Sequence, residues 1–110
     1  MLDRVAGQLT RYMDLLSARQ KLVASNIANA DTPGYRTQDI DFQREFLNAA
    51  GGSPQIIDIP DLKIKNDGNN VSLDRESRLL AENALRFQLA SQLMKSQIRV
   101  VRSAIQEGKA

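Results

Sequence analysis

The sequence predicts a mainly α-helical chain. Long N- and C-terminal helices are expected to pair as an antiparallel, coiled-coil-like hairpin, with an irregular, weakly β middle segment between them. Apolar residues recur with heptad-like spacing at both ends, a Pro-Gly pair interrupts the first pattern, and turn-forming residues crowd the middle. The 110 residues leave room for one small domain. We divide it into an N-terminal helix at 1–31, a turn at 32–35, an extended arm at 36–71 and a C-terminal helix at 72–110.

The N-terminal helix is indicated by apolar residues that recur in alternating steps of four and three from Leu2 to Ala30. Pro33 disfavours helical angles at Thr32, and Pro33-Gly34 suits the central pair of a type II turn. We therefore expect the helix to stop near Ala30. The large apolar residues that form its seam are Leu9, Met13, Leu16, Val23 and Ile27.

The C-terminal helix shows the same spacing from Leu73 to Ile105, with Ser72 placed to cap its start and Gly108 to end it. Its seam residues are Leu80, Phe87, Met94, Ile98, Val101 and Ile105. We expect the two seams to pack against each other. A second stripe lies one residue before them, at Leu15, Leu22, Leu79, Leu93 and Val100. It is either a widened apolar face or a contact with neighbouring subunits.

The middle segment carries loop and weak strand signals. Gly51-Gly52-Ser53-Pro54 indicates a loop, and Asp67-Gly68-Asn69-Asn70 indicates a turn. The alternation at 57–59 and 62–64 is typical of short strands and favours one weak hairpin. Asp39 and Asp41 form the one carboxylate pair here, and we expect both to face solvent or to cap.

The composition argues against an enzyme. The chain has no Cys and no His, which removes thiolate nucleophiles, disulfides, the usual neutral base and the commonest metal ligand. Gly51-Gly52 lacks the Lys-Ser or Lys-Thr of a phosphate-binding loop. We therefore predict no catalytic residues, no metal, no cofactor and no small-molecule substrate. No apolar run approaches the ~18 residues that span a bilayer, and the start lacks the apolar core of a signal peptide.

Charge gives no strong indication of nucleic acid, because the net charge is only +2. The basic excess sits late in the chain, at Arg86, Lys95, Arg99, Arg102 and Lys109 against Glu107. This excess is either a solvated helix end or a contact with an acidic neighbour. A coiled-coil adaptor or a nucleic-acid-binding helical module is the alternative that it supports.

A string of eleven residues resembles the signature of flagellar basal-body rod and hook proteins: Ser25-Asn26-Ile27-Ala28-Asn29-Ala30-Asp31-Thr32-Pro33-Gly34-Tyr35. The residues that carry the family signature are Asn26, Asn29, Asp31, Thr32, Pro33, Gly34 and Tyr35. The segments 36–42, 67–69 and 81–88 are similar to the proximal rod members of that family. The likeness is weakest at 47–64, where this chain is shorter. Asn26 and Asn29 share one helix face, so their amides can bond the carbonyls left free where the helix ends.

The resemblance implies a structural subunit of the hollow, helically assembled rod that crosses the periplasm and serves motility. It implies export in an unfolded state by the flagellar type III apparatus, without a cleaved signal peptide. The partners it implies are copies of the chain itself, other rod proteins, the basal rod adaptor and the MS ring, and transiently the export gate. No nucleic acid is implied.

Phe42 and Phe46 also match a short family pattern. In early export substrates of this family, a Phe followed four residues later by an apolar residue docks on the export gate. The same spacing places both rings on one helical face, so an amphipathic packing pair is the alternative.

Overall fold

The structure is a computed structural model that describes residues 2–48 and 50–108. Its elements in chain order are α1 (Leu2–Ala28), β1 (Gln38–Ile40), α2 (Phe42–Leu47), β2 (Ile56–Asp58) and α3 (Leu73–Gly108). The expected helix ends at residues 1, 109 and 110 lie outside the described residues, as does the seam side chain of Leu2.

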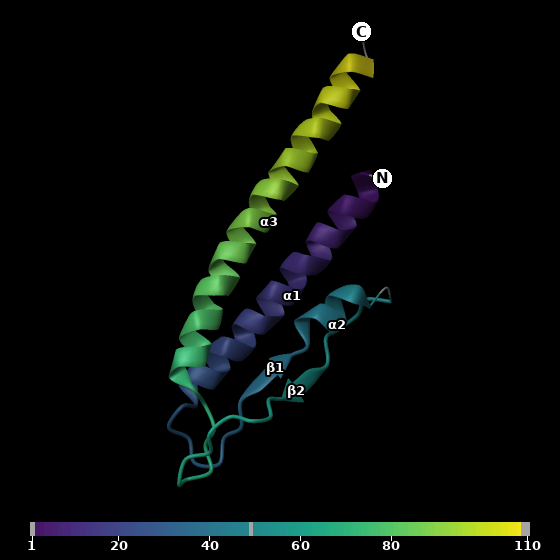
Figure 1. The fold of residues 1–110 in the computed structure, drawn as a ribbon. Helices are drawn as coiled ribbons and strands as arrows, with labels where there is room; N and C mark the ends of the chain where they lie inside the picture. The colour runs from purple at the N-terminus through teal and green to yellow at the C-terminus, as the bar shows by residue number, and fades with distance from the viewer. Residues whose placement is uncertain (1, 49, 109–110) are drawn as a thin grey trace.

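The two long helices run antiparallel side by side, and the arm that contains β1, α2 and β2 covers one side of α1 (Figure 1). The molecule measures 70 × 26 × 17 Å. Its radius of gyration is 18.3 Å, against the ~13 Å of a compact domain of this length. The fold class predicted from the sequence, a mainly helical hairpin with a weak β middle, is confirmed. Because α3 is nine residues longer than α1, its C-terminal end extends past the start of α1.

The predicted cap of α3 and the predicted turn after α1 are confirmed in atomic detail, although α1 ends at Ala28, two residues before the expected stop near Ala30. The Ser72 hydroxyl accepts a hydrogen bond of 3.2 Å from the Arg75 amide, which is the N-cap contact expected at the start of α3. Beyond α1, the Tyr35 amide donates to the Thr32 carbonyl at 3.2 Å, and Gly34 has φ = +76°. A positive φ at the third residue is what a type II turn requires, and glycine adopts it without a steric cost.

The arm forms one small antiparallel ladder, in which Gln38 lies opposite Asp58 and Ile40 opposite Ile56. The expected strand near 57–59 therefore exists, but its partner is β1. The expectation of a strand at 62–64 is wrong, since that stretch is irregular. A short strand is stabilised by burying one face. Ile40 is only 3% exposed against α1, whereas Ile64 is 53% exposed.

The apolar core is small. Its fully buried members among the described residues are Leu15, Leu16, Val23, Ala30, Ile40, Val71, Leu79 and Ala90. On α1 the expected seam does face α3, since Leu16 and Val23 are buried. Leu15, from the second stripe, is also buried, because the arm covers that side of α1. In this helix the second stripe is therefore part of a widened apolar face.

On α3 the expected packing of the two seams is wrong by one helical position. The buried line consists of Glu76, Leu79, Asn83 and Ala90. The seam residues Leu80, Phe87, Ile98, Val101 and Ile105 are 38% to 54% exposed, and Met94 is half-buried. The physical reason is that two polar side chains in the buried line have partners on α1. Glu76 accepts from Asn26 at 3.1 Å and Asn83 donates to Gln20 at 3.1 Å, interactions that a pattern of apolar residues cannot reveal.

A buried ion cluster fastens the arm to both helices. Arg19 of α1 donates to both carboxylate oxygens of Asp39, at 3.0 and 2.9 Å. Arg75 of α3 donates to Asp39 at 2.6 Å and to Glu76 at 2.8 Å. Asp39 is 2% exposed, so the expectation that it faces solvent or caps a helix is wrong. Asp41 does cap α2, by accepting from the Arg44 amide at 3.2 Å.

The electrostatic state of Asp39 follows from these contacts. Burial by itself raises the pKa of Asp39, because the charged form loses hydration. The hydrogen bonds from Arg19, the Ile40 amide and Arg75, together with the charge of Arg19, outweigh burial and lower the pKa of Asp39 below its ordinary value of 3.8. The carboxylate is therefore ionised at neutral pH and stabilises the fold.

We predict that Asp39→Asn destabilises the chain by about 3 kcal/mol at pH 7, because two partly buried guanidinium groups lose a shared counter-charge. Since the pKa of Asp39 is lower in the folded state, its stabilisation is complete above the unfolded pKa and disappears as the pH falls below about 4. Thermal unfolding of both proteins from pH 7 to pH 3 should show a difference that narrows toward acid. Asp41→Asn is the control, and equal melting temperatures for the two variants at pH 7 would contradict the prediction.

Candidate assembly site: the signature turn and the outer faces of the helices

Asn26 is the centre of the signature end of the molecule. It is 1% exposed, and both ends of its amide are bonded. Its nitrogen donates to the Gln38 carbonyl at 2.9 Å and to Glu76 at 3.1 Å. Its oxygen accepts from the Gln38 amide and the Tyr35 hydroxyl, both at 3.1 Å. The side chain thus pairs with β1 as a neighbouring peptide group would. The expectation that Asn26 bonds helix-end carbonyls is wrong, because these partners lie in the signature turn, in β1 and in α3.

The carbonyls at the end of α1 are bonded by nearby amides and also by side chains from the loop before α3. Asn29 donates to the Ser25 carbonyl at 2.8 Å, as expected. Asn69 donates to the carbonyls of Asn29 and Thr32, both at 2.9 Å, and Lys65 donates to that of Ala30 at 3.1 Å. The loop before α3 therefore closes the end of α1, although the two are far apart in the sequence.

The two turns touch each other at a pair of glycines. The Gly34 amide donates to the Asp67 carbonyl at 2.9 Å, and both Gly34 and Gly68 have positive φ. A Cβ atom at Gly68 would lie 3.4 Å from the Cα atom of Gly34. Around this closed end Asp31, Thr32 and Pro33 are exposed, while Tyr35 is half-buried against Ser25 and Asn26.

The sequence predicted no bonding role for several residues of this network, although it indicated the turn that contains two of them. They are Arg19, Thr37, Asn69, Asn70, Arg75 and Glu76, all of them polar and most of them buried. Thr37 and Asn70 bond each other twice, through the Thr37 amide at 2.6 Å and the Thr37 hydroxyl at 3.2 Å. The one available signal was the Asp67-Gly68-Asn69-Asn70 turn, whose two Asn residues follow the Gly directly.

The outer surface of α3 has two separate apolar faces. We call Leu80, Ala84, Phe87, Ile98 and Ile105 the Phe87 face, and Leu85, Leu89, Leu93 and Val100 the Leu89 face. Successive residues of a helix turn by about 100°, so these two sets lie on opposite flanks of the buried line of α3. All nine residues are exposed, and the large side chains in both faces are 40% to 60% exposed.

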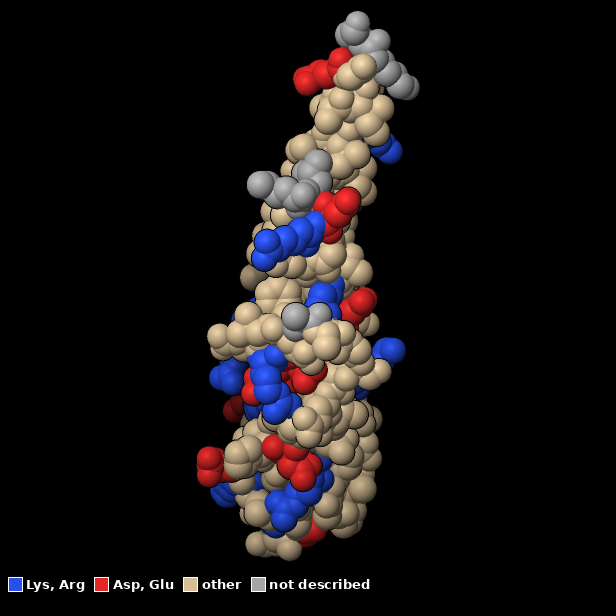
Figure 2. Space-filling view, turned by 90° about the vertical axis from the view of Figure 1, so that its right-hand side faces the viewer, with Lys and Arg blue, Asp and Glu red and all other residues tan. Residues whose placement is uncertain are grey.

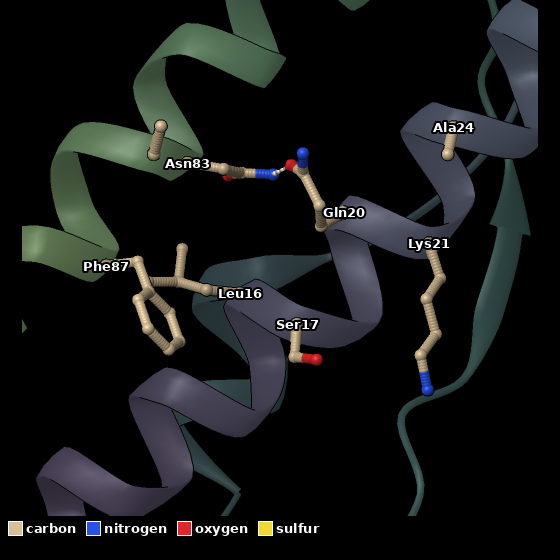
Figure 3. Close-up of a pocket in the computed structure, with 8 residues that line it drawn as sticks. Leu16, Ser17, Gln20, Lys21, Ala24, Asn83 and Phe87 are labelled. Atoms are coloured by element: carbon tan, nitrogen blue, oxygen red, sulfur yellow. Dashed lines mark hydrogen bonds between the residues drawn. The ribbon is translucent and has the colours of Figure 1, made fainter.

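The Phe87 face borders a groove of about 570 Å³ between α1 and α3, lined by Leu16, Ser17, Lys21, Ala24, Asn83 and Phe87, among others (Figure 3). Gln20 and Asn83 point toward each other across its floor, and Leu16 lies beside Phe87. Ser17 and Ala24 have short side chains, so they do not fill the α1 side of the groove. The groove is therefore mostly apolar and open to a side chain from outside.

The Leu89 face borders a second groove, of about 400 Å³, where α2 meets the helix pair. Its lining includes Val5, Leu9, Tyr12, Phe46, Leu89 and Leu93. Phe42 and Phe46 both stand edge-on to the Tyr12 ring, with centroids 5.3 and 5.6 Å away. Phe42 is half-buried and Phe46 is 36% exposed, so the two rings pack on α1 without being enclosed.

The late basic residues Arg86, Lys95, Arg99 and Arg102 are all exposed on α3. On the side of the molecule drawn in Figure 2, charged residues concentrate over the lower half, and the protruding part of α3 is largely uncharged.

Of the α1 seam, Leu9, Met13 and Ile27 are half-buried beside the buried Leu16 and Val23.

Within residues 2–48 and 50–108 no group of three or more acidic, His or Cys side chains is arranged to hold a metal ion. None of the helices in that part of the chain combines the length and apolarity that a bilayer crossing needs.

We predict that Asn26→Asp destabilises the fold by about 3 kcal/mol or more, although the two side chains are nearly isosteric. The carboxylate cannot donate to Gln38 and Glu76, and it stands beside the buried Glu76 carboxylate. Denaturant unfolding should show the loss, with Asn66→Asp in the exposed loop as the matched control. An equal midpoint for the two variants would refute this role for Asn26.

The comparisons with known proteins agree on one family. The family model described as "Flagella basal body rod protein" matches residues 13–36, the second half of α1 and the signature turn. "Flagellar basal body rod protein FlgB" of Yersinia ruckeri is 33% identical over 98% of this chain and 100% of the relative. The protein of the same name from Salmonella typhimurium is 32% identical over 98% and 99%, respectively.

These alignments run over 137 and 138 positions, more than the 110 residues of this chain, so the relatives have residues without a counterpart here. Neither relative is named as an adaptor or a nucleic-acid-binding protein. The chain is a structural, non-enzymatic component of the flagellar rod, and it belongs to the FlgB family of flagellar basal body rod proteins.

Proposed function

We propose that the chain assembles helically with copies of itself through the outer faces of its terminal helices, and so builds part of the hollow drive shaft. Its further neighbours in this proposal are other rod proteins, the basal rod adaptor and the MS ring. The observation that carries it is a contrast between two parts of the molecule. The buried polar side chains around the signature turn, such as Asn26 and Asn69, have hydrogen-bond partners within the chain, whereas the apolar Phe87 and Leu89 faces of α3 are exposed.

The amount of exposed apolar surface supports this proposal. Ten large apolar side chains of α3 are at least 38% exposed: Leu73, Leu80, Leu85, Phe87, Leu89, Leu93, Ile98, Val100, Val101 and Ile105. Only Leu79 and Ala90 of this helix are buried apolar residues. Contiguous apolar surface on a soluble chain marks a contact with another molecule. A rod subunit, which is surrounded by neighbours, has that contact permanently.

We further propose that the chain reaches the rod in the periplasm by unfolded export through the flagellar type III gate. The small apolar core supports it, because eight buried apolar residues give a fold that is readily unfolded. In this proposal the signature residues act as a rigid joint between the two helices, and the exposed Asp31, Thr32 and Pro33 are the part of that joint available to a neighbour.

We predict that Ile98→Asp abolishes rod assembly and motility. Ile98 is 48% exposed in the single chain, so the chain itself should fold. In the assembled rod the new carboxylate would be buried without a partner, at a cost of several kcal/mol. Gln88 is exposed between the two apolar faces, on the outward line of α3 that lies opposite its buried line. Gln88→Asp adds the same charge there and is the control. A motile strain whose basal bodies contain the Ile98→Asp protein would rule out this contact.

We predict that replacing both Phe42 and Phe46 by Ala keeps the protein in the cytoplasm, if these rings dock on the export gate. Tyr12→Ala is the control that separates export from packing, because it removes the ring on which both Phe side chains pack and leaves the export pattern intact. The measurement is how each protein divides between cytoplasm and medium in cells whose rods cannot be completed. Normal secretion of the double variant would leave packing as the only role of the two rings.

A further inference from the structure

The Phe87 and Leu89 faces differ in shape and lie on opposite flanks of one rigid helix. We propose that copies of this chain join through unlike faces, with the Leu89 face of one copy seated on the Phe87 face and groove of the next. This inference rests on the proposed function, in which copies assemble with one another, and it adds which surfaces meet.

Symmetry distinguishes the two ways in which copies can pair. If like faces met, two copies would form a closed pair around a twofold axis, and the other face of each would remain uncovered. If unlike faces meet, each added copy presents a fresh face, so the assembly continues as a ring or a helix. Every copy brings one face of each kind. Unlike pairing therefore covers both apolar surfaces with a single type of contact. If other proteins covered them instead, two different partners would be needed, one for each face.

The shapes of the faces favour the unlike pairing. Leu85, Leu89 and Leu93 are spaced by four residues and form a ridge along α3. The Phe87 groove offers a low surface for such a ridge, since Ser17, Ala24 and Ala84 line it. A ridge packed into a groove is how helices meet closely.

The charges point the same way. Exposed Lys21, Lys95 and Arg102 border the Phe87 face, and Asp3 lies near its Ile98 end. Two carboxylates, Glu82 and Glu107, lie in line with the Leu89 face together with Arg78, and Arg86 lies beside it. Two Phe87 faces pressed together would bring two sets of mainly basic residues close to one another, whereas a Leu89 face brings as many carboxylates as basic groups in line with it.

Cysteine cross-linking tests the pairing, because the chain has no Cys of its own. Ser91 lies in line with the Phe87 face and Ser96 in line with the Leu89 face, and both are partly exposed, so Ser91→Cys and Ser96→Cys are nearly isosteric probes. Each variant replaces the native protein in cells, basal bodies are purified, and a short bis-maleimide is applied. Gln88→Cys, on the outward line of α3, controls for cross-linking by crowding.

The expected result is a ladder of dimers, trimers and higher products for the double variant, and only monomer for each single variant and for Gln88→Cys. The two single variants expressed together should give dimers and nothing larger. Dimers from the Ser91→Cys or the Ser96→Cys variant alone would show that like faces meet, and dimers from Gln88→Cys would show cross-linking by crowding. Either result, or no product from a double variant that is present in the basal bodies, overturns the pairing. Absence of the protein from basal bodies would instead overturn the proposed function on which the pairing rests.

Discussion

The amide of Asn26 joins the end of α1 to the signature turn, to the arm and to α3. It bonds the hydroxyl of Tyr35 in the turn, the backbone of Gln38 in the arm and the carboxylate of Glu76 in α3, which lies 50 residues away in the sequence. A side-chain amide can donate twice and accept twice from one buried position, whereas a carboxylate has no donor and a hydroxyl has only one. Together with the Asp39 ion cluster and the Asn83–Gln20 bond, this group determines the position of the arm on α1 and the position of α3 beside α1.

The same bonds determine which part of α3 faces outward. Glu76 and Asn83 must reach Asn26 and Gln20 on α1, so the line that contains them turns inward and the more apolar neighbouring line turns out. Phe87 and Ile98, which apolar periodicity alone would bury against α1, are therefore 43% and 48% exposed. The polar contacts near the signature turn thus create the apolar surface farther along α3. In the assembly that we propose, the signature thereby contributes to contacts between subunits even where it touches no neighbour.

The sequence predicted the elements better than their orientation. The helices, the Ser72 cap and the Pro33-Gly34 turn follow from local rules, which act within a few residues. The rotation of α3 and the burial of Asp39 could not be predicted, because each depends on partners from distant segments. Asn26 illustrates the limit: its burial fits the resemblance to a signature, but its partners in β1 and α3 are visible only in the fold.

In the assembly that we propose, a core held in register by buried polar groups suits a subunit that folds beside copies of itself. Apolar contacts are not directional, and two heptad-patterned helices can slide or rotate against each other, or against those of a neighbouring copy, at little cost. Asn26, Asp39 and Asn83 allow one arrangement, since any other leaves a buried amide or carboxylate without its partner. The buried polar groups thus define one fold, and the largest apolar surfaces remain exposed and available for the association that we propose.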